Sequence, residues 1–499
     1  MSRRSLLGAL VGGSASLGLA ACTQPSGSGG GPGPPAWYVS NFAGTLSISG
    51  YVDRPSVNRG EDLTLHLNCI GSDAGSPVVV AVHRTGWYGG QGASTYVPPT
   101  TITAPLQQPA TAVVDPVSLR CEASWEPVLT ISTETGGTPW PTGTYVFQLT
   151  GTSGKQAYVP FTVRDDASTS PYLFVNNHMT WWAYNNEGGY NLYNGGSEVG
   201  PQRPFRSDPV RNSQGAGEYF WLEYRMVRWL ERNGFDVSYV ADFDLDLRPV
   251  PDSTQAIVLA GHSEYWTGRM RANVDDAMAQ RGVGVVSFGA NTCYWRGRLE
   301  GTTATAPGHY VCWKSPTGFA STADPLQDDP ALATMLFRRI PGLAEHYMLG
   351  GGFQGWVDAN AYVPGPALNS TALHFTDVSH PVFAGTGIVS GQEFPGLCGG
   401  EFDWWDPVFG PNPGTTICDT PLDVVFSNHH PLLVPDHQQS SVQEKSFPGG
   451  VRSRVFNAGT YTWTWGLDNF SFEDFAFAFA NPRIQQLTGN ILRWAAKEI

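Results

Sequence analysis

Two side chains that can bind metals or move protons stand close together in the segment QAIVLAGHSEYW, residues 255–266. His262 and Glu264 directly follow an apolar run, residues 256–260, which predicts a buried strand. A carboxylate can bind a hard metal ion or accept a proton, and an imidazole can also stabilise developing negative charge. The alternative is that both side chains cap the next helix or bond to neighbouring loops, because polar loop residues are common.

Three other segments carry candidate groups. Tyr184, in TWWAYNNEGG, offers a phenolate ligand or an acid–base group, or else belongs to an aromatic lid or core. Asn291, at the end of SFGAN, can donate a hydrogen bond to a carbonyl or oxyanion, or form an Asx-turn. Glu401 and Asp403 lie in the glycine-rich segment GGEFD, which suits a general base, a calcium site or a turn.

Other common site patterns are weak or missing. His429 and His430 could ligate a metal, but adjacent residues on a strand point to opposite faces. The HExxH pattern of zinc peptidases and the GxSxG elbow of serine hydrolases are absent. No GxGxxG or P-loop pattern follows a predicted strand, so we do not expect a nucleotide cofactor.

The elements that must position these groups alternate between strand and helix. This alternation predicts a doubly wound, mainly parallel sheet, in which ligands bind beyond the carboxyl ends of the strands. We therefore expect Tyr184, His262, Glu264 and Asn291 to gather at one sheet edge. The predicted strands are residues 172–177, 236–240, 256–260 and 283–289, and the predicted helices are 218–233, 270–281 and 481–497.

The region before this alternation has a different pattern. Residues 37–165 show short strands separated by turn signals and no helical period, which predicts a β-sandwich. A polar linker leads into residues 170–499, the expected α/β domain with the catalytic-like residues. The predicted fold class is therefore β plus α/β, with an N-terminal β-sandwich followed by the parallel-sheet domain.

Composition narrows the classes of partner. The formal net charge is −14 and no basic tract occurs, so nucleic acid is not an expected partner. Charged residues make up only 14% and aromatic residues 12%, which favours a loop-rich globular protein over a disordered chain or a coiled coil.

The N-terminus predicts export. Paired arginines, a short apolar run and the ending LAAC, within residues 1–22, indicate a twin-arginine signal followed by lipidation of Cys22. Residues 23–36 are rich in Gly, Ser and Pro and predict a flexible tether. We therefore expect an extracytoplasmic protein that is anchored to the membrane through its lipid; the alternative is an ordinary signal in which Cys22 is incidental.

Six further cysteines form an even set, which suits disulfides in an exported chain. Neighbours in sequence suggest three pairs, one of the 15 possible connectivities. The expected pairs are Cys69–Cys121, Cys293–Cys312 and Cys398–Cys418.

Taken together, five segments resemble the large-subunit catalytic region of N,N-dimethylformamidase and its relatives. They are RTGWYGGQGA, TWWAYNNEGGYNLY, GHSEYW, GANTCYWRGRLE and RVFNAGTYTWTWGL. The resemblance covers roughly residues 37–497. It implies a β-sandwich joined to a glutamine-amidotransferase-like α/β domain, and a mononuclear iron centre, expected to be Fe³⁺, that hydrolyses a small amide.

The resemblance also implies roles for single residues. Glu264 would be the carboxylate ligand of the iron, or of another first-row metal, and Tyr184 one phenolate ligand. Tyr145, in PTGTYVFQL, would be the second phenolate. His262, Asn291 and Glu401 match pocket residues of the family, with Glu401 as the general base.

Other functions stay open at this point. The family's enzyme works inside the cell with a separate small subunit, whereas this chain carries an export signal, so a cell-envelope or environmental amide is the expected substrate. A surface carbohydrate-binding protein without catalytic activity is one alternative, motivated by the 17 tryptophans. A metal-independent hydrolase using Glu401 and His262 is another. Assembly with further copies of the chain is also open.

Overall fold

In the computed structural model, Trp37–Ile499 form one compact unit. The structure describes residues 35–43, 47–103, 107–206, 214–303, 306–357, 370–411, 414–422, 424–427, 436–470 and 479–499. The expected export signal, most of the expected tether, and His429 and His430 lie outside these residues. None of the helices within them has the length and hydrophobicity needed to cross a bilayer.

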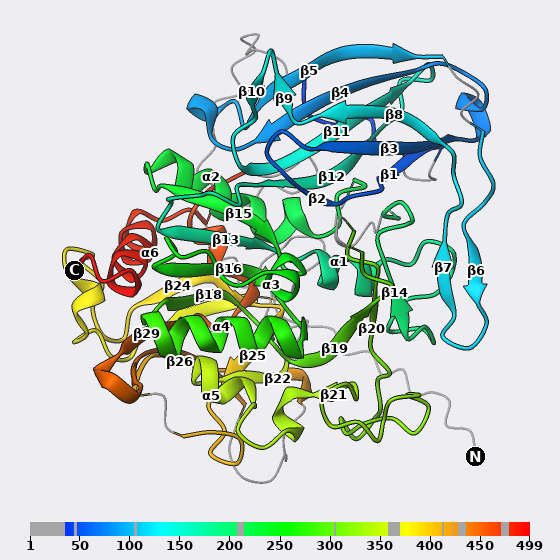
Figure 1. The fold of residues 1–499 in the computed structure, drawn as a ribbon. Coiled ribbons are helices and arrows are strands. Elements are labelled where there is room, and N and C mark those ends of the chain that lie inside the picture. The colour runs from blue at the N-terminus through cyan, green and yellow to red at the C-terminus, as the bar shows by residue number, and fades with distance from the viewer. Residues whose placement is uncertain are drawn as a thin grey trace, which may run out of the picture. The chain divides into compact units, whose positions relative to one another are not determined.

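The N-terminal part consists of two sheets that share one hydrophobic core (Figure 1). Leu65 and Leu67 of one sheet and Phe147 and Phe161 of the other are fully buried in this core. The five-stranded sheet has the order β2 (Ser56–Asn58), β12 (Gln156–Arg164), β11 (Gly143–Gly151), β4 (Val78–Thr85) and β5 (Ala93–Ile102). The three-stranded sheet has the order β1 (Ile48–Val52), β3 (Asp62–Cys69) and β8 (Pro127–Ser132).

A seven-stranded sheet follows in the chain, and the predicted strands at 172–177, 236–240, 256–260 and 283–289 are confirmed within it. Its order is β15 (Val237–Ala241), β13 (Tyr172–Asn176), β16 (Ala256–His262), β18 (Gly284–Ala290), β29 (Arg452–Asn457), β28 (His437–Ser446) and β26 (Thr415–Pro421). The first five strands are parallel and the last two pair antiparallel. The whole is a strand-rich mixed fold, compatible with a β part followed by an α/β part.

Helices cover both faces of the parallel strands. Ile257 and Leu259 of β16 pack in one core with the helix α4 (Gly268–Arg281), and Val258 and Ala260 pack in another with α2 (Tyr224–Arg232) and α6 (Pro482–Ala495). A strand buried on both faces explains why the run 256–260 is uninterrupted by polar residues.

The helix predictions are confirmed, with local differences at the ends. Thr267 caps α4 by accepting a hydrogen bond from the Met270 amide, and Gly282 closes the helix in the left-handed region at φ 68°. Pro482 stands in the first turn of α6, whose N-cap Asn481 accepts from the Arg483 amide. The predicted helix 218–233 instead begins with a π-helical turn, Tyr219–Glu223, before α2.

Smaller elements frame the carboxyl edge of the parallel strands. A short helix, α1 (His178–Tyr184), follows β13 and ends at Tyr184. Short strands form a sheet β14–β20–β19–β17 and a sheet β25–β22–β27. Their bounds are β14 (Glu198–Val199), β17 (Tyr265–Thr267), β19 (Trp295–Glu300), β20 (His309–Val311), β22 (Gly352–Val357), β25 (Glu401–Trp404) and β27 (Val424–Ser427), and two hairpin strands, β6 (Ala112–Asp115) and β7 (Arg120–Glu122), reach toward β14.

The three expected disulfides are absent, since the six cysteines that the structure describes all carry free thiols. Cys69 lies in the shared core of the N-terminal sheets, whereas the Cys121 thiol donates to the Gly188 carbonyl at 3.4 Å. Cys293 Sγ instead accepts a hydrogen bond from Arg271 at 3.5 Å. Cys398 and Cys418 lie in one core cluster, and Cys293 and Cys312 in another, yet their thiols are free as well.

Candidate active site

Two glycines let the ends of β16 and β18 approach closely. Gly261 has φ 71°, and a Cβ at this position would overlap the Leu222 side chain. A Cβ at Gly289 would overlap the Gly261 carbonyl on the adjacent strand. Both positions therefore require glycine, and the resulting register sets His262 beside Ala290, one residue before Asn291.

The Glu264 carboxylate is the centre of an oxygen-rich cluster. The Tyr184 hydroxyl donates to its Oε2 at 2.8 Å, and the Tyr193 hydroxyl donates to Oε2 at 2.8 Å and Oε1 at 3.0 Å. The two hydroxyl oxygens lie 2.5 Å apart. Tyr265 donates to Tyr193 at 2.8 Å, and the Lys314 ammonium donates to Tyr265 at 2.9 Å. These groups form a chain of hydrogen bonds from Lys314 to Glu264.

Local structure fixes Glu264 in this position. Its carbonyl accepts from the Tyr294 and Trp295 amides at 3.0 and 3.1 Å, and its amide donates to the Thr180 hydroxyl at 3.2 Å. The Glu264 side chain is only 2% exposed. Burial alone would raise the pKa of this carboxyl, but the contact with His262 and the charge of Lys314 lower it to about 2. Glu264 is therefore an anion at neutral pH.

His262 is surrounded by three carboxylates. Its Nε2 lies 3.1 Å from Glu264 Oε2 and 3.4 Å from Glu401 Oε2, and its Nδ1 lies 3.2 Å from Glu218 Oε2. Burial disfavours the charged imidazole, but the charges of Glu401 and Glu218 raise the pKa of His262 well above its usual value. The ring is thus a donor at both nitrogens.

Glu401 reaches the cluster from β25, which belongs to the small sheet β25–β22–β27. It is 2% exposed, and its Oε2 accepts a hydrogen bond from the Tyr461 hydroxyl. Tyr461 belongs to a short 3₁₀ helix, Tyr461–Gly466, and its ring lies 4.7 Å from the His262 ring. Two different elements thus hold Glu401 and His262 in contact.

Asn291 adopts a left-handed backbone, with φ 55°, directly after β18. Its amide donates to Asp403 Oδ1 at 2.8 Å, and Asp403 also accepts from the Asn457 side chain at 3.1 Å. The Asn291 side-chain oxygen is buried and has no hydrogen-bond partner within the described part of the chain. A strained backbone and an unpartnered amide oxygen are costly unless a ligand or water completes the site.

These groups line a cavity of about 800 Å³. Tyr184, Glu264, Asn291 and Glu401 all contribute to its wall, and His262 touches two of them from behind. The structure therefore brings together five of the six site residues expected from the sequence.

The sixth, Tyr145, does not lie with them. It belongs to β11, where it is 0% exposed in the core of the N-terminal sheets, between the rings of Trp140 and Phe161. Its hydroxyl donates to the Pro141 carbonyl at 2.7 Å. The expectation that Tyr145 joins Tyr184 and Glu264 is thereby corrected, since the second tyrosine at Glu264 is Tyr193.

Five neighbours of the cluster were not expected from the sequence. Three of them had a usable signal: Tyr193 ends the segment TWWAYNNEGGYNLY, Tyr265 directly follows Glu264 in GHSEYW, and Tyr461 lies in RVFNAGTYTWTWGL. Glu218 and Lys314 come from segments distant in sequence and had no such local signal. The five are Tyr193, Glu218, Tyr265, Lys314 and Tyr461.

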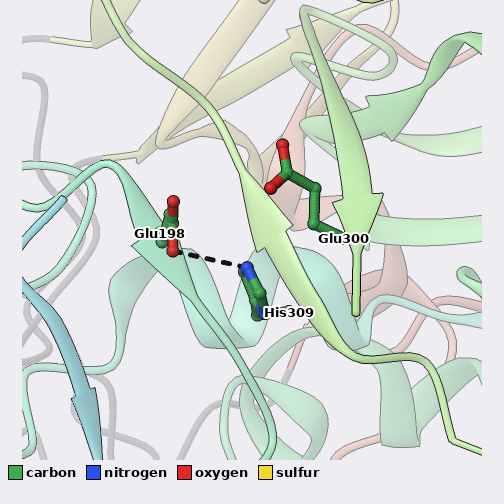
Figure 2. A group of neighbouring side chains, drawn as sticks. All are labelled: Glu198, Glu300 and His309. Atoms are coloured by element: carbon green, nitrogen blue, oxygen red, sulfur yellow. Dashed lines mark ion pairs between the residues drawn. The ribbon is translucent and has the colours of Figure 1, made fainter. Parts of the chain in front are cut away.

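A second group of metal-binding side chains lies at β14, β19 and β20. Figure 2 shows Glu198, Glu300 and His309, whose donor atoms lie within 4.8 Å of one another. The Arg120 guanidinium already stands there, 3.2 Å from Glu198 Oε2 and 2.9 Å from His309 Nε2. Arg298 pairs with Glu300 at 2.5 Å. Arginine charge neutralises both carboxylates, so this group ties the β6–β7 hairpin to β14 and β20.

Comparison with known proteins agrees with the resemblance seen in the sequence. No curated protein matches the chain. The family model described as "N,N-dimethylformamidase beta subunit-like, C-terminal" matches residues 79–476, which is most of the chain and includes every residue of the Glu264 cluster. The protein therefore belongs to the N,N-dimethylformamidase beta subunit-like family.

Proposed function

We propose that the protein is a metal-dependent amidohydrolase that cleaves a carbon–nitrogen amide bond, with iron as the metal. One observation carries this proposal: the hydroxyls of Tyr184 and Tyr193 meet at the carboxylate of Glu264, on the wall of a cavity that Glu401 and Asn291 also line. Membership of the dimethylformamidase family supports the choice of reaction.

The residues present fit a metal. The Tyr184, Tyr193 and Glu264 oxygens lie 2.5–3.0 Å apart, close to the spacing of adjacent ligands whose bonds to a first-row metal are about 2 Å long. Hard, anionic oxygen donors suit ferric iron. Desolvation of its hydroxyl within the cluster and the negative charge of Glu264 raise the pKa of Tyr193 well above its usual value, so only a strongly charged cation would hold its phenolate at neutral pH.

When bound, the metal would supply Lewis acidity toward a water molecule and the amide oxygen. Tyr184, Tyr193 and Glu264 would hold it. Tyr265 and Lys314 orient Tyr193 through the hydrogen-bond chain, and Thr180 orients the Glu264 backbone.

Glu401 is the proposed general base. It accepts one proton from the attacking water while the water oxygen forms a bond to the carbonyl carbon. The carbon–nitrogen bond then breaks, and the same proton passes to the leaving nitrogen, so the products are a carboxylic acid and an amine. The Tyr461 hydroxyl holds Glu401 in the orientation that faces the cavity.

His262 and Asn291 are proposed to stabilise the negative charge that develops on the carbonyl oxygen. His262 is protonated between its carboxylates, so its positive charge lies directly behind the wall that Glu264 and Glu401 form, and the Asn291 side chain lines the cavity itself. Asp403 positions Asn291 by accepting its backbone amide hydrogen.

Metal content and activity together test this function. We expect the purified full chain to hold about one iron per molecule and to release amine from small amides such as dimethylformamide. Chelation and Glu264→Gln should remove both properties, whereas the matched change Glu300→Gln, in the group tied by Arg120 and Arg298, should leave both intact. A metal-free chain of normal stability that still hydrolyses amides would overturn the proposal in favour of a metal-independent reaction using Glu401 and His262.

A carbohydrate-binding role is the second candidate, because Trp295, Trp356, Asn186, Asn191 and Asn194 also line the cavity. Aromatic faces and side-chain amides are suitable contacts for sugar rings. Glycan binding that survives both Glu264→Ala and chelation, in a chain that hydrolyses no amide, would favour this role.

We also propose that the chain is exported and anchored by a lipid on Cys22, as its first residues predict. Metabolic labelling with a fatty acid should tag the wild-type chain and fail to tag Cys22→Ala. A labelled Cys22→Ala chain, or a wild type that stays unlabelled inside the cell, would contradict this localisation.

A further inference from the structure

The cavity is far larger than a small amide requires. Its volume is about 800 Å³, within the range that accommodates ligands of drug size. A molecule with five non-hydrogen atoms, such as dimethylformamide, displaces only a few waters of about 30 Å³ each. The space beyond the Glu264 cluster therefore leaves room for a larger substrate than dimethylformamide.

Lys314 lines this cavity beside the cluster and is joined to it through Tyr265. Its ammonium lies 3.5 Å above the centre of the Tyr193 ring and 5.1 Å from that of Trp295, and it donates one hydrogen bond, to Tyr265. Among the described residues no carboxylate forms an ion pair with it, and the charges of Glu264 and Glu401 act on it only at longer range. An ammonium has three donors, so Lys314 keeps hydrogen-bonding capacity for a ligand.

The other cations near the cavity are engaged differently. Arg338 forms an ion pair with Glu345 and also donates to the Phe353 carbonyl at 2.8 Å. Arg339 is exposed at the rim, where its guanidinium carbon lies 4.8 Å from the centre of the Phe319 ring. Lys314 is thus the half-buried cation of the wall that an anionic group of the substrate would meet.

From this arrangement we infer that the substrate is an N-acyl-α-amino acid, whose carboxylate binds Lys314 while its amide carbonyl lies at the Glu264 cluster. The inference rests on the proposed amidohydrolase function. Only Tyr265 and Tyr193 separate Lys314 from Glu264, so the carboxylate must lie close to the scissile bond. In an N-acyl-α-amino acid a single carbon separates the carboxylate from the amide nitrogen. The remaining aromatic wall would take the amino-acid side chain.

The binding of two non-hydrolysable ligands, an acid and its ester, tests the proposed contact between Lys314 and the substrate carboxylate without requiring activity. N-methylsulfonyl-alanine carries a carboxylate, which its methyl ester replaces with an uncharged, slightly larger group. The full chain should bind the carboxylate at least about tenfold more tightly in calorimetric titration, as expected for one charge-assisted hydrogen bond. Lys314→Met should remove this preference and Lys314→Arg should keep part of it. The control Lys155→Met removes a surface charge hydrogen-bonded to Asn41 and should leave the preference unchanged.

Hydrolysis rates then test whether the contact between Lys314 and the carboxylate also matters for catalysis. The ratio of kcat/KM for N-acetylalanine to that for its methyl ester should be high in the wild type and should collapse in Lys314→Met. Equal binding of acid and ester by the wild type would overturn the inference, whether or not amides are hydrolysed. A preference that survives Lys314→Met but is lost in Arg339→Met would also overturn it. If the chain prefers the carboxylate but hydrolyses no amide, the contact between Lys314 and the carboxylate would stand and the proposed reaction would be rejected.

Discussion

Tyrosines occupy two very different settings in this molecule. In the core of the N-terminal sheets, Tyr145 lies between two aromatic rings, and its hydroxyl donates a hydrogen bond to the Pro141 carbonyl. At the edge of the parallel strands, the hydroxyls of Tyr184 and Tyr193 both donate hydrogen bonds to the Glu264 carboxylate, on a cavity wall. The residue type is the same, and the partner of the hydroxyl distinguishes the two settings.

The difference shows how to separate structural from chemical tyrosines. Burial raises the pKa of the Tyr145 hydroxyl, which donates a hydrogen bond to the Pro141 carbonyl and does not line the cavity at Glu264. Half of the Tyr193 side chain is exposed, while its hydroxyl lies among Glu264, Tyr184 and Tyr265. An anionic neighbour together with access from a cavity is the arrangement that suits a metal ligand.

The largest effect is expected from Glu264→Gln. The substitution removes the charge that both tyrosines share, so amide hydrolysis should fall about a thousandfold or more, as for loss of a central electrostatic group. Iron content should fall with it, measured by elemental analysis of the purified chain. Thermal unfolding close to that of the wild type would show that the loss is chemical, and unchanged iron and rate would contradict the role of Glu264.

Tyr145→Ala should lower the stability of the fold and leave iron binding unchanged, the opposite of Glu264→Gln. Removing a buried aromatic side chain leaves a cavity in the sandwich core and should cost about 3–5 kcal/mol of the free energy of unfolding. Iron bound per folded molecule should stay the same, measured on the folded fraction after size-exclusion chromatography. Loss of iron from chains that remain folded would return Tyr145 to the ligand set.

The two regions meet at a buried network around Glu223. The Asn176 side chain accepts from Thr144 of β11 at 2.8 Å and donates to Glu223 at 3.0 Å, and the Trp181 indole donates to Glu223 at 2.8 Å. Burial raises the pKa of Glu223 to about 8. The folded state therefore keeps a proton that the unfolded chain releases near pH 4.5.

This proton makes the free energy of unfolding depend on pH. The stability that Glu223 contributes is complete below about pH 4.5 and is lost as the pH rises to about 8, a loss of a few kcal/mol. Glu223→Gln should flatten this part of the profile, measured by urea denaturation at pH 5, 6.5 and 8. Parallel profiles for wild type and variant across this range would contradict the assignment.

The smallest effect is expected from Tyr145→Phe. It removes one hydrogen bond to a backbone carbonyl and should cost about 1 kcal/mol in denaturant unfolding. Amide hydrolysis and iron content should match the wild type, and a rate loss comparable to that of Tyr184→Phe would erase the distinction between the two settings.

Much of the fold and part of the site could be predicted from local patterns. The apolar run before His262 and the helix at 270–281 depend on neighbours in sequence, and both predictions are confirmed. Asn291 and Glu264 follow neighbouring parallel strands, whose carboxyl ends share one edge of the sheet. Their positions on the wall of one cavity could therefore be predicted. Period-two alternation places Tyr145 on the same face as Phe147 and Leu149, so the strand pattern itself favoured the core over a ligand role.

The rest of the site depends on contacts that no local pattern specifies. Tyr193 reaches Glu264 because a loop after α1 folds back, with the Asn191 side chain accepting the Tyr193 amide at 2.8 Å. Lys314 follows β20, and the pairing of β20 with β19 brings it to the wall. Long-range pairing of this kind was not visible in composition or periodicity.

Absorption spectra of the iron-loaded protein test the central claim most directly. Phenolate bound to ferric iron gives a visible charge-transfer band, and we expect this band in the wild type and in Tyr145→Phe with equal intensity. Tyr193→Phe and Tyr184→Phe should each weaken and shift it. A band that is unchanged in Tyr193→Phe, or lost in Tyr145→Phe, would contradict a centre held by Tyr184, Tyr193 and Glu264.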